Sequence, residues 1–489
     1  MKPENIPENI GAISESLEKA GFEAYLVGGC VRDVLAGRKP KDWDFTTNAR
    51  PEDIIKIFPK TFYENEYGTV GVVNENTEDE SLKVVEITPY RIEGKYSDYR
   101  RPDSVVFSKN LEDDLKRRDF TINAIAYDIT KGQIVDPYNG QKDIKDKVIR
   151  AVGNPEERFA EDALRVLRAI RLATELGFMI NNETEKALEN NVKNLGKIAQ
   201  ERIRDEFIKL IMSPNPMIGI VLANRLGILK YVSPETEAGI NVKQNGDHIY
   251  DVWEHNLRAL QHSADREWPL HVRLSALFHD VSKPETRRWS DEKKDYTFYG
   301  HDVVGSRVTK KILERMRFPR EIVDVVSKLV RYHLFFSDVD KITLSAVRRI
   351  VKNVGPEHVW DLMKLRACDR IGMGRPKETP YRLRKYESMI EEAMRAPISV
   401  AMLKIDGKRI MEVTHETPGP KIGYVLHALL EEVLDEPERN TTEYLEKRSV
   451  ELIKLSIEEL KKLGEEGKAK KEEEESKEVS EIRKKHWVK

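Results

Sequence analysis

The chain has 489 residues, a length that predicts about three or four domains, each with a hydrophobic core of its own. It excludes a single small binding module. Lysine and arginine number 83 and aspartate and glutamate 85, so the net charge of −2 indicates no class of partner, and a nucleic-acid surface would have to be a local patch. Charged residues make up 34% of the chain and apolar residues 39%, which is enough for globular folding.

Two features of the sequence indicate the cellular compartment. Cys30 and Cys368 are far apart and match no zinc or disulfide spacing, which is typical of a reducing compartment. Residues 1–10 lack a basic segment followed by an apolar core, and no run of about 18 apolar residues occurs anywhere. The sequence therefore predicts a cytoplasmic protein that is neither secreted nor membrane-spanning.

Residues 1 to about 130 combine helix and strand patterns. Ile10, Ile13 and Leu17 have the spacing of one face of a helix. Strand composition occurs in four segments, at residues 24–27, 70–73, 82–88 and 105–107. Together these patterns predict an α/β unit.

The rest of the chain is predicted to be mainly helical, because strand patterns nearly vanish after the turn signal DPYNG at residues 136–140. Long amphipathic helices are expected at residues 158–177, 182–194 and 198–212. Residues 456–489 hold ten acidic and ten basic side chains and almost no apolar face. This tail is expected to be a loose charged helix or disordered, since it cannot bury enough surface to offset the entropy of ordering.

A pair of glycines lies at the end of the first predicted strand. The segment LVGGCVRD, residues 26–33, passes from a strand through Gly28 and Gly29 into a helical pattern. Without a Cβ in the way, backbone N–H groups and the helix N-terminus can approach a triphosphate, and Arg32 adds a guanidinium group. A glycine pair alone is weak evidence for such a site.

Two aspartates follow a short distance downstream. In KDWDF, residues 41–45, alternation along a strand places Asp42 and Asp44 on one face and Trp43 on the other. Two such carboxylates repel each other unless a cation lies between them, and Mg²⁺ prefers one or two carboxylates together with phosphate oxygens. An isolated Asp-x-Asp motif is more often a solvated strand end, but the preceding glycine pair favours a metal site.

These residues carry a resemblance to a known family. Residues 26–45 are similar to motif A of the class II tRNA nucleotidyltransferase and bacterial poly(A) polymerase family, whose head has the polymerase-β-type nucleotidyltransferase fold. Further motifs follow in the family's order: RRDFTINA at 117–124 (motif B), IVDPYNG at 134–140 (motif C), EDALR at 161–165 (motif D) and ERIRDEF at 201–207 (motif E), with a weaker similarity at 419–433. Five ordered motifs make the resemblance specific.

The resemblance implies an α+β fold, with an N-terminal polymerase-β-type nucleotidyltransferase head containing a mixed sheet, followed by a mainly α-helical body. It implies template-independent addition of CCA to the 3′ end of tRNA from CTP and ATP, with Mg²⁺ as the cofactor. The implied residues are Gly28, Gly29 and Arg32 for the triphosphate, Asp42 and Asp44 for the metal ions, and Arg118, Asp119 and Asn123 for the sugar and phosphates.

Two points about this site stay open in the sequence. A third carboxylate is often present on a neighbouring strand of such sites, and Glu86 is the candidate here. In motif B, Asp119 would alternatively cap a helix that begins at Phe120, although a cap would not explain the two arginines before it.

Motif D is predicted to select the base. Asp162, Arg165, Arg168 and Arg171 recur every three residues on a predicted helix, a stripe that is usually a solvated face with ion pairs. Cytosine and adenine both present an exocyclic amine beside a ring acceptor, whereas guanine and uracil present the reverse order. The resemblance implies that Asp162 and Arg165 read this edge without a nucleic-acid template, while Arg168 and Arg171 support the base and phosphates.

A polar segment at residues 91–102, RIEGKYSDYRRP, lies between strand patterns and is predicted to be a surface hairpin loop. It is similar to the family's flexible loop, which enzymes that add the terminal A retain. Its presence favours CCA or A addition over addition of the two C residues alone.

A second set of polar residues lies in the helical half. His255 lies on a predicted helix, and His279 and Asp280 end another in the string FHDVSKP. Neutral imidazoles and carboxylates suit a divalent transition metal, although residues so widely spread would otherwise be separate core and surface groups. His301 and His333 follow farther along the chain.

The string HDVSKP resembles the HD superfamily of metal-dependent phosphohydrolases. The resemblance implies that His255, His279, Asp280 and Asp369 are metal ligands in an HD-type helical domain. Ser282 replaces the glycine that is common after the pair, so an HD-type fold without hydrolase activity is an alternative.

Five segments are expected: a nucleotidyltransferase head at 1–135, a helical neck with the base-selecting helix at 136–235, an HD-type domain at 236–375, a C-terminal helical RNA-binding region at 376–455 and a charged tail at 456–489. The expected activity is CCA addition. Poly(A) polymerase or A-only addition is the nearest alternative, and an HD phosphohydrolase with a nucleotide-sensing N-terminal unit is an alternative from another class.

Overall fold

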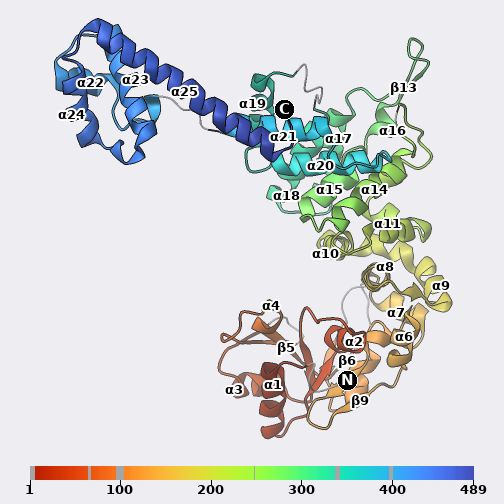
Figure 1. Ribbon diagram of the computed structural model, residues 1–489. Coiled ribbons are helices and arrows are strands. Elements are labelled where there is room, and N and C mark those ends of the chain that lie inside the picture. The colour runs from red at the N-terminus through yellow and green to blue at the C-terminus, as the bar shows by residue number, and fades with distance from the viewer. Residues whose placement is uncertain are drawn as a thin grey trace. The chain divides into compact units, whose positions relative to one another are not determined.

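The computed structural model describes residues 6–63, 68–94, 104–246, 248–335, 342–395 and 400–488. The chain divides into two compact units, residues 1–333 with 364–376 and residues 334–363 with 377–489 (Figure 1). Within the described ranges, none of the helices has the length and apolar run needed to cross a membrane. The predicted flexible loop falls mostly outside these ranges.

A seven-stranded sheet forms the N-terminal part of the first unit (Figure 1). Strand β2 pairs antiparallel with β1 and parallel with β5, so the predicted mixed sheet is confirmed. In spatial order the strands are β3 (Thr61–Tyr63), β4 (Val70–Val73), β5 (Val84–Pro89), β2 (Asp44–Thr47), β1 (Tyr25–Val27), β8 (Ala126–Asp128) and β9 (Gln133–Val135). A separate antiparallel pair, β6 (Arg91–Glu93) and β7 (Val105–Phe107), forms the described base of the flexible loop.

Short helices and the ends of strands surround this sheet. Ile10, Ile13 and Leu17 are buried on α1 (Glu8–Lys19), as their spacing predicts. The expected strand at 82–88 instead begins at Val84, because the Asp79 side chain accepts a hydrogen bond from the Ser81 N–H and caps a short helix there. The helices of this part are α2 (Gly29–Leu35), α3 (Pro51–Ile57), α4 (Glu80–Lys83), α5 (Leu111–Lys116), η2 (Thr121–Asn123) and α6 (Gly140–Asp146).

The helical neck begins with a break that the sequence pattern did not predict. The expected helix at 158–177 is two helices, α7 (Pro155–Glu161) and α8 (Leu164–Leu176), separated by Asp162 in an extended conformation. The Asp162 carboxylate accepts a hydrogen bond from the Leu164 N–H at 3.0 Å, which starts the second helix. The prediction of one continuous helix is therefore wrong.

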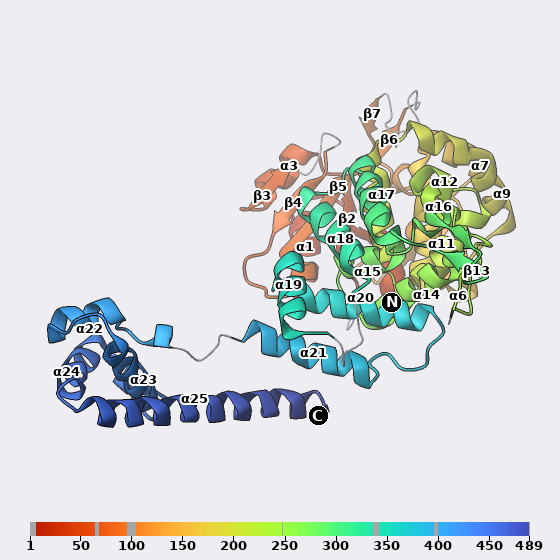
Figure 2. The same cartoon turned by 90° about the horizontal axis from the view of Figure 1, so that it is seen from above.

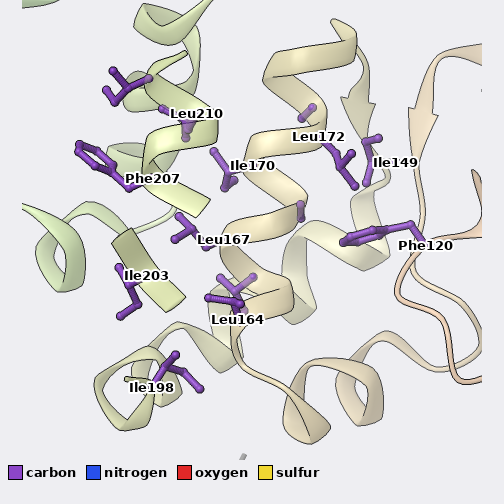
Figure 3. Packing of buried hydrophobic residues seen from close by; sticks show 14 of the residues in the cluster. Phe120, Ile149, Leu164, Leu167, Ile170, Leu172, Ile198, Ile203, Phe207 and Leu210 are labelled. Carbon is purple, nitrogen blue, oxygen red and sulfur yellow. The ribbon is translucent and has the colours of Figure 1, made fainter. Parts of the chain in front are cut away.

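Helix α8 packs against α10 (Gln200–Ile211) through buried apolar side chains. Figure 3 shows Leu164, Leu167 and Ile170 on α8 beside the helix that carries Ile203, Phe207 and Leu210. Between them in sequence lie β11 (Met179–Ile180), α9 (Asn182–Asn191) and η3 (Val192–Lys197), and β11 pairs with β10 (Val148–Ile149), which precedes α7. The helices expected at 182–194 and 198–212 are thus present with slightly shorter bounds.

The remainder of the first unit is an array of helices with one small hairpin. Its elements are α11 (Pro216–Arg225), α12 (Leu229–Val232), α13 (Pro234–Glu237), α14 (Val252–Asp265), α15 (Leu270–Phe278), α16 (Lys283–Thr286), β12 (Arg288–Ser290), β13 (Asp295–Thr297), α17 (His301–Arg315), α18 (Arg320–Tyr332) and the end of α20 (Val359–Gly372). Their apolar faces continue the core cluster that includes the head and neck.

The second unit is helical throughout its described residues and ends in a 29-residue helix, α25 (Ile457–Lys485). Its other elements are α19 (Leu344–Val354), α21 (Tyr381–Met394), η4 (Val400–Met402), α22 (Gly407–Thr414), α23 (Pro420–Asp435), η5 (Pro437–Arg439) and α24 (Thr442–Leu452). Figure 2 shows α22, α23 and α24 gathered along the N-terminal part of α25.

The charged tail forms a helix, as one of the two alternatives expected, and side chains near both ends of this helix contact other helices. Leu460 is fully buried in a cluster with Ile422 and Leu429. At the other end of α25, Arg483 pairs with Glu392 on α21 at 3.1 Å. The sequence pattern did not reveal this packing because a few apolar residues at one end and long-range ion pairs at the other hold the helix.

Candidate functional site

A polar pocket of about 270 Å³ lies on the head and neck. It is lined by Gly28, Gly29, Arg32, Asp42, Asp44, Arg118, Asp119, Asn123, Arg168, Arg171 and Lys209. Ten of the eleven lining residues were predicted to bind nucleotide or metal, whereas Lys209 on α10 was not. Nothing in the local sequence distinguishes Lys209 from a solvent-exposed lysine on an amphipathic helix.

The glycine pair leaves room beside both metal-site aspartates. Gly28 has a φ of 81°, in the region that favours glycine, and joins β1 to α2. A Cβ on Gly28 would lie 3.6 Å from the Asp44 carboxylate and 3.2 Å from the Arg118 guanidinium. A Cβ on Gly29 would lie 3.7 Å from the Asp42 carboxylate. Side chains here would fill the space between the carboxylates and a bound phosphate.

Asp42 and Asp44 lie close together, as predicted, but only Asp44 belongs to the strand. Strand β2 begins at Asp44, and Asp42 precedes it in a bend, so the prediction that both lie on a strand is wrong. Trp43 between them is buried. Burial, together with the nearby charges of Asp42 and Glu86, raises the pKa of Asp44 to about 7. A cation would relieve this accumulation of negative charge, and oxygen ligands suit Mg²⁺.

Glu86 is the partner of Asp44 in the parallel register of β2 and β5. The neighbouring-strand position expected for a third carboxylate is therefore present. Glu86 is exposed and does not line the pocket. Its role as a metal ligand stays a prediction.

Motif B places the buried Asp119 carboxylate against side chains that line the pocket. The Asp119 carboxylate accepts hydrogen bonds from Arg168 at 2.6 and 2.8 Å and from the Asn123 amide at 3.1 Å. The Asn123 oxygen in turn accepts one from Arg32 at 2.9 Å. Burial opposes ionisation of Asp119, but Arg168 holds its pKa well below the usual range. Asp119 therefore anchors pocket groups and is more than a helix cap, since the turn after it is a single 3₁₀ turn.

The remaining motif B arginines share a carboxylate that the sequence analysis missed. Asp114 on α5 is fully buried and accepts from Arg117 at 2.6 Å and from Arg118 at 3.0 Å. The i, i+3 and i, i+4 spacing of these residues on a helix was the available signal. Asp114 fixes the Arg118 guanidinium at the edge of the pocket.

Motif C packs against the 3₁₀ turn of motif B. Asp136 accepts a hydrogen bond from the Gly140 N–H at 2.7 Å, which shapes the turn into α6. A Cβ on Gly140 would lie 2.2 Å from the Thr121 carbonyl oxygen. Only glycine therefore allows α6 to approach the 3₁₀ turn that carries Asn123.

The four motif D residues are separated into two groups. Asp162 lies in the break before α8 and pairs with Arg202 of motif E at 2.8 Å. Arg165 is buried and donates to Glu161 at 2.6 Å and to the Arg117 carbonyl at 3.1 Å. The expected stripe on one helix is wrong, and so is the solvated-face alternative. Neither Asp162 nor Arg165 lines the pocket.

The other two members of motif D face the pocket and are held by motif E. Arg171 pairs with the buried Glu206 carboxylate at 2.7 Å, and Arg168 lies 3.7 Å from the same residue. Lys209, one turn farther along α10, lies 3.9 Å from Glu206. Glu206 is therefore the shared counter-charge of three pocket cations, a role that the sequence motif did not indicate.

A second polar cluster lies among the helices of the same unit. It brings together the four predicted HD ligands: His255 on α14, His279 and Asp280 after α15, and Asp369 on α20. Nε2 of His255 lies 2.8 Å from Nε2 of His279, 3.0 Å from the Asp280 carboxylate and 3.4 Å from the Asp369 carboxylate. All four residues are buried.

Two further histidines face the other oxygen of Asp280. Nε2 of His301 lies 3.2 Å and Nε2 of His333 lies 3.6 Å from Oδ1 of Asp280. In His279, His301 and His333, Nδ1 lies 2.6 to 2.9 Å from the carbonyl oxygen three residues earlier in the chain. A proton on Nδ1 makes that bond and leaves the Nε2 lone pair facing the cluster.

The donor set fits a divalent transition metal. Nε2 of His301 and of His333 is buried and has no hydrogen-bond partner among the described residues. Ligand atoms of His255, His279 and Asp369 lie within 4.8 Å of one another, as do those of Asp280, His301 and His333. Buried imidazole nitrogens aimed at carboxylates are the ligands such metals prefer.

Lys283 and His248 lie beside this cluster and were not predicted to belong to it. Nζ of Lys283 lies 2.6 Å from Oδ2 of Asp280. Burial opposes ionisation of Asp280, but Lys283 and His279 hold its pKa well below the usual range. The half-buried His248 lies 3.5 Å from Lys283 and within ligand range of His255 and Asp280. His248 precedes α14 outside any periodic pattern, so no sequence pattern indicated its role.

Comparisons with known proteins place the chain in a family. Three family models match, described as poly A polymerase head domain at residues 24–150, probable RNA and SrmB-binding site of polymerase A at 177–240 and HD domain at 246–360. The CCA-adding enzyme of Leuconostoc mesenteroides is 34% identical over 423 residues, which cover 85% of this chain and 88% of that enzyme. The chain belongs to the CCA-adding enzyme family. The resemblance and the fold class expected from the sequence are confirmed.

Other CCA-adding enzymes align over shorter segments. That of Ligilactobacillus salivarius is 49% identical over 224 residues, or 45% of this chain and 54% of that enzyme, so the chain spans about half the length of this relative. A solved CCA-adding enzyme of Bacillus stearothermophilus, in complex with CTP, is 29% identical with a TM-score of 0.60 and covers 92% of this chain and 98% of that chain. A CCA-adding enzyme solved with ATP shares the fold at 19% identity and a TM-score of 0.52, covering 92% and 97%.

Membership of this nucleotidyltransferase family implies dependence on a divalent metal. In the head, the raised pKa of Asp44 beside Asp42 and Glu86 indicates an accumulation of negative charge that a cation would neutralise. A bound cation would offset the cost of burying the Asp44 carboxylate.

Proposed function

We propose that this protein adds CCA to the 3′ end of tRNA, using CTP and ATP and no nucleic-acid template. The observation that carries the proposal is the head pocket, in which Asp42 and Asp44 lie beside the Gly28–Gly29 turn. A carboxylate pair for metal ions beside guanidinium groups for a triphosphate is the arrangement that nucleotidyl transfer requires. The guanidinium groups in the pocket belong to Arg32, Arg118, Arg168 and Arg171.

In the proposed reaction, the RNA 3′-hydroxyl attacks the α-phosphate of the nucleotide and pyrophosphate leaves. Asp42 and Asp44 would hold Mg²⁺, which activates the hydroxyl and neutralises charge on the leaving group. Arg118, fixed by Asp114, and Arg168, fixed by Asp119, offer donors in set positions to the phosphates. Because buried acids already orient these guanidinium groups, little reorganisation is needed as charge develops in the transition state.

Base selection is proposed for Asp162 and Arg165. To meet a base, Asp162 must exchange its bond with Arg202, and Arg165 must exchange at least its bond with Glu161. The helix break supports this proposal, because the Asp162 backbone is extended and lies outside both flanking helices. A carboxylate and a guanidinium together complement the amine and ring nitrogen of cytosine or adenine.

The test is an end-product assay with three tRNA substrates, lacking CCA, lacking CA and lacking only A. We expect the first to gain CCA, the second CA and the third A, and each addition to stop there. Products are resolved by single-nucleotide electrophoresis after incubation with CTP, with ATP and with both. Addition of A alone to all substrates, or long A tails, would replace CCA addition by the A-only or poly(A) alternative.

A second function is supported by the histidine cluster. We propose that His255, His279, Asp280 and Asp369 bind a divalent transition metal, with His301 and His333 contributing at the second oxygen of Asp280. The converging Nε2 atoms without partners among the described residues support metal binding over a structural cluster. Such a centre would hydrolyse phosphate esters through an activated water.

The metal proposal is tested by elemental analysis after dialysis against Ni²⁺, Co²⁺ or Mn²⁺ and removal of free ions. Wild type should retain metal that Asp280→Ala loses. Hydrolysis of 2′,3′-cyclic nucleotides, phosphate monoesters and phosphodiesters is then measured with the loaded protein. Bound metal without hydrolysis of any of these would leave a structural metal site only.

We also propose that Mg²⁺ is the metal of the head and that tRNA, CTP and ATP are the partners of this protein. The five segments expected from the sequence are proposed as its domains. A cytoplasmic location is supported by Cys30 and Cys368, which are buried and form no disulfide.

A further inference from the structure

A two-stranded hairpin beside the histidine cluster carries an unusual set of side chains. We call residues 287–299 the aromatic ribbon; they comprise β12, β13 and the turn between them, RRWSDEKKDYTFY. Figure 1 shows β13 near α16 and α17, the elements that flank the ribbon in the chain. Neither the catalytic pocket of the head nor the proposed metal centre uses these side chains.

Large aromatic rings are exposed on the ribbon. The side chain of Trp289 is 55% exposed and that of Tyr299 is 74% exposed. Trp289 packs edge-on against Tyr296, with ring centroids 5.2 Å apart, and its indole N–H donates to Asp291 at 3.0 Å, which fixes the indole plane. Leaving such rings in water is unfavourable, so the exposed faces indicate a binding surface.

Cations accompany these rings. The guanidinium of Arg287 lies 3.5 Å from the centroid of the Tyr296 ring, and Nζ of Lys293 lies 5.3 Å from that of Tyr299. Arg288 and Lys294 are exposed on the same hairpin. The ribbon contains no Leu, Ile, Val or Met, so its apolar side chains are all aromatic. Aromatic faces with adjacent cations are the pattern of a stacking surface for nucleic-acid bases and phosphates.

The C-terminal end of the ribbon contacts residues at the histidine cluster. The Asn245 amide donates to the Tyr296 carbonyl at 2.6 Å, and Nδ1 of His301 bonds to the Phe298 carbonyl at 2.6 Å. Nζ of Lys283, which contacts Asp280, lies 5.7 Å from the Phe298 ring. The end of the ribbon that leads into α17 therefore lies beside the cluster.

We propose that the aromatic ribbon binds single-stranded RNA by stacking bases on Trp289 and Tyr299, with Arg288, Lys293 and Lys294 contacting its phosphates. The surface is independent of nucleotide addition in the head. RNA bound on the ribbon would present its phosphates to the histidine cluster, an inference that rests on the proposed metal site. The substrate class of that site would then be nucleotide phosphates, not small phosphate esters.

The probe is a fluorescein-labelled hexauridylate that ends in a 3′-phosphate. Because it has no 3′-hydroxyl, it cannot be a primer for the head. Fluorescence anisotropy measures its affinity for the full chain, for Trp289→Ala/Tyr299→Ala and for the control Trp487→Ala, which removes a tryptophan that is 83% exposed on the second unit. We expect at least about a tenfold loss in the double variant and less than about twofold in the control.

A crosslinking experiment locates the contact directly. The same oligonucleotide with 4-thiouridine at two positions is irradiated with the protein, and the crosslinked peptide is identified by mass spectrometry. We expect crosslinks within residues 287–299. Crosslinks found only elsewhere, or equal affinity of all three proteins, would overturn the proposal. Thermal unfolding of the double variant at the wild-type temperature would exclude misfolding. Because no metal or nucleotide is added, a failure to bind the oligonucleotide is distinct from a failure of either proposed activity.

Discussion

At the scale of single residues, the head pocket depends on buried acids that orient phosphate-facing cations. Asp114, Asp119 and Glu206 are each almost fully buried, and each holds an arginine that lines the pocket. Removing such an acid leaves a partly buried guanidinium without its counter-charge, which destabilises the head. The acids therefore support both the stability of the head and the geometry of the site.

Metal binding at Asp44 should depend on pH. Burial, together with Asp42 and Glu86, raises the pKa of Asp44 to about 7. Below that pH the carboxyl carries a proton that a cation must displace, so affinity for Mn²⁺ should rise from about pH 6 to about pH 8 and then level off. Calorimetric titration in two buffers of different ionisation enthalpy measures the released protons.

The same titration of Asp44→Asn isolates the head, because this variant leaves the histidine cluster unchanged. The difference between wild type and variant should carry the proton release. A wild-type affinity that is equal at both pH values would contradict the raised pKa of Asp44.

Base choice is predicted to depend on Asp162 more than overall turnover does. A lost bidentate contact to a base forfeits roughly 1 to 3 kcal/mol of discrimination, so Asp162→Ala should admit UTP and GTP at rates closer to those of CTP and ATP. The measurement is kcat/KM for all four nucleotides on tRNA that lacks CCA. Arg202→Ala is the matched control, because it removes the partner of Asp162 at 2.8 Å and leaves the carboxylate. Unchanged ratios in Asp162→Ala would refute the base-selecting role.

At the scale of elements, the sequence predicted which motifs contribute to the head pocket but not where the helices that carry them begin and end. The glycine turn and the two aspartates were predicted from residue types whose chemistry is local. The break at Asp162 was missed because helical periodicity continues across it, and only a side-chain hydrogen bond to Leu164 shows where the second helix begins. Lys209 and His248 were missed because their roles depend on tertiary neighbours.

Motif C predicts a strict requirement for glycine. In Gly140→Ala the new Cβ would lie 2.2 Å from the Thr121 carbonyl oxygen, so α6 or the 3₁₀ turn must move. We expect a loss of about 1 to 3 kcal/mol in unfolding free energy, with weaker nucleotide binding because Asn123 lies in that turn. Urea denaturation and CTP titration measure the two effects.

Gly11→Ala is the control for this change. Gly11 lies within α1, and a Cβ there would meet no atom within 4 Å. Replacing a helical glycine by alanine should be neutral or should stabilise the head by up to about 1 kcal/mol. Equal effects of the two substitutions would show that the contact between Gly140 and Thr121 is not the constraint.

The final helix should depend on one buried leucine. Leu460 is fully buried in the second unit, whereas Ile457, one turn earlier on α25, is 59% exposed. Leu460→Ala should destabilise this unit by about 2 to 5 kcal/mol, and Ile457→Ala by less than about 0.5 kcal/mol. Thermal unfolding followed by circular dichroism tests the pair, and similar losses would place the anchor of α25 elsewhere.

At the scale of the whole molecule, one unit carries two centres of different chemistry. The head pocket uses hard oxygen ligands and guanidinium groups, whereas the histidine cluster uses imidazoles and carboxylates. The residues of one do not overlap those of the other. A nucleotidyltransferase head and an HD-type domain therefore occur in one chain with separate sets of residues, and each proposed metal would have ligands of the kind that it prefers.

The two centres should therefore fail independently. Asp42→Ala removes a proposed metal ligand of the head and should lower nucleotide addition about a thousandfold or more, while transition-metal content at the histidine cluster stays at the wild-type level. His279→Ala should do the reverse, because substitutions at distant sites without shared partners act additively. Incorporation of labelled CTP into tRNA lacking CCA and elemental analysis provide the two readouts, and Asp42→Ala/His279→Ala should lose both. Loss of nucleotide addition in His279→Ala alone would instead make the cluster a support for the head, and hydrolysis that survives in Asp42→Ala would show a second activity that does not need the first.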